Sequence, residues 1–172
     1  MITEKMQDAM NEQIKWELYS AYLYMSMSAY YASTNLMGFA NWMRVQAQEE
    51  TVHALKFYDF INERGGRVEL RAVDAPPKDW ASPLAVFQDT CDHERIVTGR
   101  IGDLVDLARS LRDHASEIFL QWFVTEQVEE ESSTDEVVQE LKRIQDNSGA
   151  MFMLDRELGQ RVFTPPAANA ST

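Results

Sequence analysis

A glutamate and a histidine three residues apart are the pair whose types and spacing point most directly to chemistry. They form the step Glu50-Thr51-Val52-His53 within a long amphipathic stretch. Two side chains three residues apart on a helix lie one turn apart on the same face. Because a carboxylate oxygen and an imidazole nitrogen suit a borderline divalent ion such as iron, this step is a candidate part of a metal site.

Further carboxylates fall in three other stretches of helical periodicity. They are Glu17, Glu94 and the run Glu126-Gln127-Val128-Glu129-Glu130. A lone glutamate is most often a solvated residue at the rim of a helix, and charged residues are almost never buried unless paired or metal-bound. Glu17 and Glu94 nevertheless lie on otherwise apolar stripes. Carboxylates from four helices that face one point therefore favour a metal-centred bundle.

The elements that must position these residues are long helices. Apolar residues recur at helical spacing over residues 4–33, 36–64, 83–111, 114–145 and 150–158. We expect an all-α protein, a four-helix bundle with one long crossover and a short C-terminal fifth helix. It forms a single domain over residues 1–163, followed by a small, polar tail at 164–172 that we expect to be disordered.

Local signals predict where these helices begin and end. Asn35 is expected to cap the second helix, and Gly65-Gly66 to end it. Ser82-Pro83 supplies a cap and a first-turn proline for the third helix. Asp113 is expected to cap the fourth helix, and Asn147-Ser148-Gly149 to break it from the fifth.

The segment between the second and third helices lacks helical periodicity. Pro76-Pro77 forbids helix, and Val68-Glu69-Leu70 suggests an extended stretch. A loop of this length is unusual in a compact domain. In a four-helix bundle, however, one long crossover is a common way to change the order of the helices.

Composition excludes several classes of partner. The net charge of −12 argues against nucleic acid and anionic membranes, which require basic surface. No stretch approaches the roughly 20 apolar residues of a membrane span, and the N-terminus lacks the order of a secretory signal, so we expect a cytoplasmic protein. The one cysteine, Cys91, allows neither an internal disulfide nor a Cys₄ site and is interpreted as a buried hydrophobe.

The general di-iron bundle takes one Glu from each of two helices and Glu-x-x-His from each of the other two. Here the second pair is replaced by Gln127 and Glu130, an amide and a carboxylate. The pattern predicts one ordinary iron position, with a bridging glutamate, made of Glu17, Glu50 and His53. The second position would be oxygen-only, weaker and only partly filled, and would be made of Glu50, Glu94 and Glu130.

Over nearly its whole length the sequence resembles the non-haem bacterial ferritins. The resemblance is carried by Glu17-Leu18-Tyr19, Tyr24, Gln48-Glu49-Glu50-x-x-His53, Glu94 and Gln121-Trp122-Phe123-x-x-Glu126-Gln127-x-Glu129-Glu130. It implies a homo-oligomeric shell of 24 subunits that oxidises Fe(II) and stores it as a ferric mineral. By this resemblance the ferroxidase centre comprises Glu17, Glu50, His53, Glu94, Gln127 and Glu130.

The resemblance also implies roles outside the di-iron centre. Glu49, Glu126 and Glu129 match a third iron position, and Tyr24 matches a tyrosine implicated in electron donation to oxygen. Packing, with the hydroxyl bonded to a site glutamate, is an equally good interpretation of Tyr24, and packing is the better one for Trp122. His53 alone is as readily a core histidine as a ligand, and its place beside Glu50 favours the ligand.

Related families differ at identifiable positions. Haem-binding bacterioferritins carry methionine after the bridging glutamate and a second Glu-x-x-His, where this chain has Thr51 and Gln127-x-x-Glu130, so no haem is expected. Rubrerythrins need a cysteine-rich segment that one cysteine cannot build. Twelve-subunit miniature ferritins place their ligands between subunits and lack the fifth helix.

Two alternative functions stay open at this point. One is a soluble di-iron oxidase or peroxidase acting on a small substrate, and the other is a structural bundle that binds cations incidentally. The working oxidant, O₂ or H₂O₂, is not fixed by the sequence. Asp113, His114 and Glu117 match the lining of an iron channel, but acidic residues at a helix N-terminus are the commoner explanation.

Overall fold

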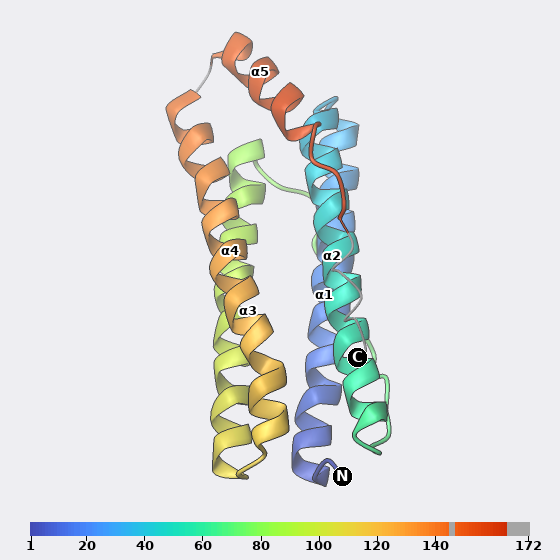
Figure 1. Cartoon of the computed structure of the whole chain (residues 1–172). Helices are drawn as coiled ribbons and strands as arrows, with labels where there is room; N and C mark the ends of the chain where they lie inside the picture. The colour runs from blue at the N-terminus through green and yellow to red at the C-terminus, as the bar shows by residue number, and fades with distance from the viewer. Residues whose placement is uncertain (145–146, 165–172) are drawn as a thin grey trace.

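The computed structural model describes residues 1–144 and 147–164, and all regular structure in these ranges is α-helical. The helices are α1 (Glu4–Ser33), α2 (Met37–Glu63), α3 (Pro83–Ser110), α4 (His114–Ile144) and α5 (Ser148–Leu158). The first four form a long bundle, and α5 lies across one end of it (Figure 1). The predicted four-helix bundle with a fifth helix is therefore confirmed. The predicted tail lies outside the described residues, apart from Thr164.

The crossover between α2 and α3 determines the helix order. It starts where α2 ends and runs the length of the bundle to the start of α3, so α2 and α3 point the same way (Figure 1). Its first residues are held by the buried side chain of Asn11 on α1. Asn11 Nδ2 donates to Arg67 O at 3.1 Å, and Glu69 N donates to Asn11 Oδ1 at 3.0 Å.

Most of the predicted helix ends are confirmed. Ser82 Oγ accepts from Ala85 N at 3.1 Å with Pro83 in the first turn, and Asp113 Oδ1 accepts from Ser116 N at 3.2 Å. Gly65 follows α2 with φ 70°, a left-handed conformation that glycine adopts without strain. No helix in the described part of the chain is long and apolar enough to span a membrane.

Asn35 is not the cap of α2, contrary to the sequence prediction. It is a left-handed residue with φ 62°, and its backbone N–H donates back to Ala32 O at 3.2 Å, so it ends the turn after α1. The start of α2 is capped from α5 instead. Asp155 Oδ1 accepts from Gly38 N at 2.8 Å and from Phe39 N at 3.1 Å.

The start of α5 also differs from the prediction, since the helix begins at Ser148 and not at Ala150. Asn147 Oδ1 accepts from Ala150 N at 3.0 Å and caps the helix, so Ser148 and Gly149 form its first turn. A cap placed directly before the helix explains this, because its side chain satisfies a first-turn N–H that glycine alone would leave free. The predicted end of α4 at residue 145 lies outside the described residues.

The bundle core consists of two apolar clusters with a polar layer between them. The cluster near α5 includes Met27, Phe39, Phe87 and Leu141. The cluster at the other end includes Met10, Phe57, Ile101, Leu120 and Phe123. On each of the four long helices a buried glutamate occupies the turns between the two clusters. The fold thus brings the predicted site residues to one level of the bundle.

Candidate metal centre

Six polar side chains from four helices meet in this layer, and each is at most 5% exposed. They are Glu17 from α1, Glu50 and His53 from α2, Glu94 from α3, and Gln127 and Glu130 from α4. Four buried carboxylates at one level are costly without a compensating cation. The layer is therefore a candidate metal centre.

One side of the layer has a geometry suited to a single metal ion. Ligand atoms of Glu17, Glu50 and His53 all lie within 4.8 Å of one another. His53 Nδ1 is 3.4 Å from Glu50 Oε2. Glu17 Oε2 is buried and has no hydrogen-bond partner among residues 1–144 and 147–164, which is rare for a buried carboxylate oxygen. An oxygen without a partner beside a carboxylate and an imidazole fits a divalent cation.

Two glutamines support this position from one turn away. Gln13 Nε2 donates to Glu17 Oε1 at 2.9 Å, and Gln46 Nε2 lies 3.4 Å from Glu50 Oε1. Gln46 Nε2 also donates to Glu130 Oε2 at 2.5 Å. No role was assigned to either glutamine from the sequence. The signal was present, because each lies four residues before a site glutamate.

The other side of the layer is more tightly hydrogen-bonded. The Tyr24 hydroxyl donates to Glu94 Oε1, and Gln127 Nε2 lies 3.1 Å from Glu94 Oε2 and 3.3 Å from Thr98 Oγ1. Among the described residues, Glu50, Glu94 and Glu130 do not bring three ligand atoms within 4.8 Å of one another. This side has to rearrange before it holds a metal ion.

Burial raises the pKa of every carboxylate in the layer. The pKa values of Glu17, Glu50 and Glu130 lie well above 4.5, first because of burial and then because of neighbouring carboxylates. Burial also raises the pKa of Glu94, although the hydrogen bonds from Tyr24 and Gln127 oppose the shift. A divalent cation in this layer would displace the protons of these carboxyl groups and would itself balance the negative charge of the carboxylates.

The three residues expected at a third iron position lie in different surroundings. Glu126 Oε1 is 3.8 Å from His53 Nε2, and Glu126 and His53 form a second possible metal group with Glu130. Glu49 Oε2 instead accepts from Arg161 Nη2 at 2.5 Å, and Glu129 is exposed. In this conformation Glu126 is the acid of the three that faces the centre.

A cavity of about 300 Å³ lies beside His53. Glu49, His53, Trp122 and Glu126 line it, together with Phe163 and Thr164 from the segment after α5. The Trp122 ring stands edge-on to His53, with centroids 5.3 Å apart, and carries Lys56 Nζ on its face at 4.1 Å. Trp122 thus packs against the ligand candidate and forms one wall of the cavity.

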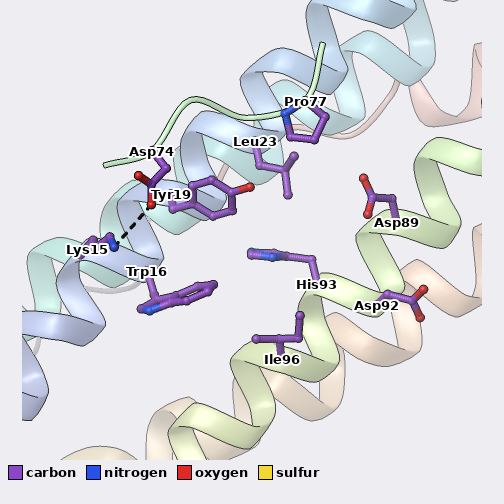
Figure 2. Close-up of a pocket in the computed structure, with 10 residues that line it drawn as sticks. All are labelled: Lys15, Trp16, Tyr19, Leu23, Asp74, Pro77, Asp89, Asp92, His93 and Ile96. Carbon is purple, nitrogen blue, oxygen red and sulfur yellow. Dashed lines mark ion pairs between the residues drawn. The ribbon is translucent and has the colours of Figure 1, made fainter. Parts of the chain in front are cut away.

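A second cavity, of about 350 Å³, lies between α1, α3 and the crossover, and none of the four buried glutamates of the layer lines it (Figure 2). His93 reaches toward Trp16 and Tyr19 there, although it adjoins Glu94 in the sequence. His93 Nε2 lies 2.7 Å from Ser20 Oγ, and burial lowers its pKa to about 4. His93 is therefore a neutral packing residue and does not face the metal layer.

The residues considered for an iron channel are engaged in local contacts. Glu117 Oε1 accepts from Arg109 Nε at 2.8 Å, and Asp113 Oδ1 accepts from Arg64 Nη2 at 3.0 Å while capping α4. His114 Nδ1 lies 3.8 Å from Glu117 Oε2. These contacts support the interpretation of the acids as helix-start residues.

Comparison with known proteins agrees with this arrangement. The Ferritin family profile, described as a ferritin-like domain, matches residues 7–144. The chain belongs to the ferritin family. The "bacterial non-heme ferritin" of Bacteroides fragilis strain 638R is 44% identical over 161 residues, which cover 94% of this chain and 100% of that protein. The protein of the same name from Staphylococcus aureus strain NCTC 8325 is 42% identical over 163 residues, which cover 95% of this chain and 98% of that protein.

Solved structures also resemble this ferritin. The open pore ferritin of Archaeoglobus fulgidus is 52% identical with a TM-score of 0.94, covering 94% of this chain and all of that one. A closed form of the same protein, engineered by mutagenesis, is 53% identical with a TM-score of 0.95, covering 95% of this chain and all of that one. The non-haem ferritin resemblance of the sequence is thereby confirmed.

Proposed function

We propose that this ferritin stores iron by oxidising Fe(II) at a di-iron centre within each subunit and depositing it as ferric mineral inside a shell. The observation that carries the proposal is the unpartnered, buried Glu17 Oε2 beside Glu50 and His53. A carboxylate oxygen without a donor, in a layer of four buried acids, is best explained by a cation as its natural partner.

The two iron positions differ in their ligands. The first Fe(II) binds Glu17, Glu50 and His53, and Glu50 is the bridge to the second. The second Fe(II) takes Glu50, Glu94 and Glu130, with Gln127 holding Glu94 in place. Because the second position has no imidazole ligand, and its three carboxylates have to move together before they can share a metal ion, it fills less completely than the first.

The chemistry follows from the hardness of the ligands. Each Fe(II) gives up one electron, and O₂ takes two electrons and two protons to leave as H₂O₂. The same centre can use H₂O₂, which takes two electrons and two protons to become two waters. Carboxylates stabilise Fe(III) more than Fe(II), so they favour oxidation. A site with a single imidazole still lets the Fe(III) product leave.

Tyr24 and the outer acids complete the proposed centre. Tyr24 positions Glu94 through its hydrogen bond, and we assign it the further role of supplying an electron during oxygen reduction. Glu49, Glu126 and Glu129 form a third iron position on the far side of His53, of which Glu126 faces the centre. No haem, nucleic acid or membrane takes part, and the protein acts in the cytoplasm.

Exposed apolar side chains support assembly into an oligomer. Tyr22 and Met25 on α1 are 47% and 52% exposed, and Leu55 and Tyr58 on α2 are 52% and 40% exposed. Apolar groups on long helices are usually covered by partners, and closed symmetric assemblies are the common solution. The proposed shell has 24 copies, as the resemblance to the non-haem bacterial ferritins implies.

Iron retention tests the proposal directly. The apo-protein is loaded aerobically with excess Fe(II), freed of unbound metal, and analysed for soluble iron per chain and for particle mass. Retention of far more iron than the side chains can ligate supports mineral storage in a shell. Uptake that stops at two or three irons per chain would instead indicate a soluble di-iron oxidase or peroxidase.

A further inference from the structure

Arg161, which follows α5, reaches the outer edge of the polar layer. Its Nη1 donates to Gln46 Oε1 at 2.8 Å, and its Nη2 donates to Glu49 Oε2 at 2.5 Å. Its guanidinium carbon lies 4.3 Å from the Trp42 ring centroid. The backbone is anchored as well, because Asn41 Nδ2 donates to Arg161 O at 2.9 Å. Arg161 is thus held at both its side chain and its main chain against α2.

The contact with Gln46 determines which way that amide points. A guanidinium group only donates hydrogen bonds, so Gln46 must present its oxygen to Arg161. Its nitrogen therefore faces inward, where it donates to Glu130 and Glu50. The reverse orientation would place the amide oxygen against two carboxylates and the amide nitrogen against a cation. Arg161 is in this way a positioning residue for two ligand candidates.

The contact with Glu49 places a positive charge where a third iron is expected. Glu49 lines the cavity beside His53, and Phe163 and Thr164 line the same cavity two and three residues after Arg161. The segment after α5 therefore supplies both part of the cavity wall and the cation that neutralises Glu49. A metal ion that binds Glu49 must displace this guanidinium or share the carboxylate with it.

We propose that Arg161 is an internal cation that competes with iron for the third position and releases Glu49 when a metal ion arrives there. The inference rests on the proposed di-iron function, because it assigns a regulator to one edge of that site. It predicts that the third position binds metal more weakly in the natural chain than its three acids alone would allow.

Zinc binding to the assembled, metal-free protein tests the competition. Zn(II) is not oxidised, so calorimetry reports binding without turnover. We expect Arg161→Ala to lower the Kd of the zinc ion that binds after the first two by about tenfold. The substitution removes a charged hydrogen bond that the metal ion otherwise has to break. Arg161→Lys keeps a point charge but loses the forked contact, so it should have a smaller effect.

Two controls separate competition from general loosening. Arg156→Ala makes the same change of charge at an exposed position of α5 and should leave all binding unchanged. In a Glu49→Gln background, Arg161→Ala should no longer affect the later equivalent, because the contested carboxylate is gone. An effect of the same size in both backgrounds would overturn the proposal.

The first two equivalents distinguish this inference from the proposed function. If the first two equivalents bind in every variant as they do in the natural protein, while Arg161→Ala leaves the later one unchanged or weaker, the competition is refuted and the di-iron centre stands. If the natural protein binds no zinc tightly at all, the proposed centre itself is wrong, and the inference fails with it.

Discussion

Tyr24 on α1 donates its hydroxyl hydrogen bond to Glu94 on α3, across the centre of the bundle. Both side chains are at most 1% exposed, so water cannot replace the bond. Burial and the charge of Glu94 raise the pKa of Tyr24 well above its ordinary value, so the phenol keeps its proton and remains a donor. The contact agrees with the packing interpretation of Tyr24, and an electron-donating role would act through the same bond.

Tyr24→Phe should weaken metal binding at the second position by about tenfold, because a hydrogen bond to a charged, buried group is lost. Fe(II) oxidation in the first turnover, followed by stopped-flow absorbance, should slow accordingly. Tyr31→Phe is the matched control, since it removes a buried hydroxyl bonded to Pro83 O at 2.7 Å on the same helix. Equal slowing by both changes would assign the effect to bundle packing.

Glu50→Ala should reduce the initial rate of Fe(II) oxidation by more than about 100-fold. Even the outer partners of a metal ligand contribute about 10–100-fold, and Glu50 is proposed to bridge both irons. Glu63→Ala, an exposed acid on the same helix, serves as the control. Oxidation at the natural rate in Glu50→Ala would remove this residue from the centre.

Glu130→Gln should change how the stability of the metal-free protein depends on pH. The pKa of Glu130 is raised in the folded protein, so the folded state keeps this proton above pH 4.5 while the unfolded state loses it. Stability from this group is present below pH 4.5 and is lost as pH rises through the raised pKa. The amide of Glu130→Gln does not titrate, so the variant does not lose stability from this group as the pH rises.

Melting temperatures at pH 5 and pH 8 measure the effect. Between these values the natural, metal-free protein should lose a few degrees more than Glu130→Gln, since ~1 kcal/mol shifts the Tm of a chain this size by about 2–4 °C. Zinc should raise the melting temperature of the natural protein more than that of the variant. A larger loss in Glu130→Gln would contradict a protonated, metal-free Glu130.

Gly38→Ala should destabilise the junction between α2 and α5 by about 1–3 kcal/mol. A Cβ at Gly38 would lie 1.5 Å from Asp155 O, so α5 has to move and the Asp155 cap on α2 is strained. Gly99→Ala on α3 is the opposite case, because nothing lies within 4 Å of its added Cβ. It should stabilise by about 0.5–1 kcal/mol. Chemical denaturation of both variants checks the pair.

The sequence predicted the helices and the buried acids because both depend on local periodicity. Glu17, Glu50 and Glu94 lie on apolar stripes, and the bundle brings those stripes to one level. Capping was predicted where the cap and the helix adjoin, as at Ser82 and Asp113. Residue roles that depend on one helix and its own flanks were therefore accessible.

Contacts between distant segments were not accessible in this way. Asp155 caps a helix that begins more than 100 residues earlier, so the sequence around α2 suggested Asn35 instead. Arg161 bonds to Gln46 across 115 residues, and no spacing rule connects them. Both depend on how α5 folds back against the start of α2, which is a property of the assembled bundle.

The two apolar clusters on either side of the polar layer determine whether the chain needs iron in order to fold. Zinc fingers reach their fold only with the ion present, because they have little apolar core of their own. Here each end of the bundle has its own core, so the chain can complete its fold before any ion reaches the acids. Starvation for iron should then leave empty but intact protein, ready to receive the metal when the supply returns.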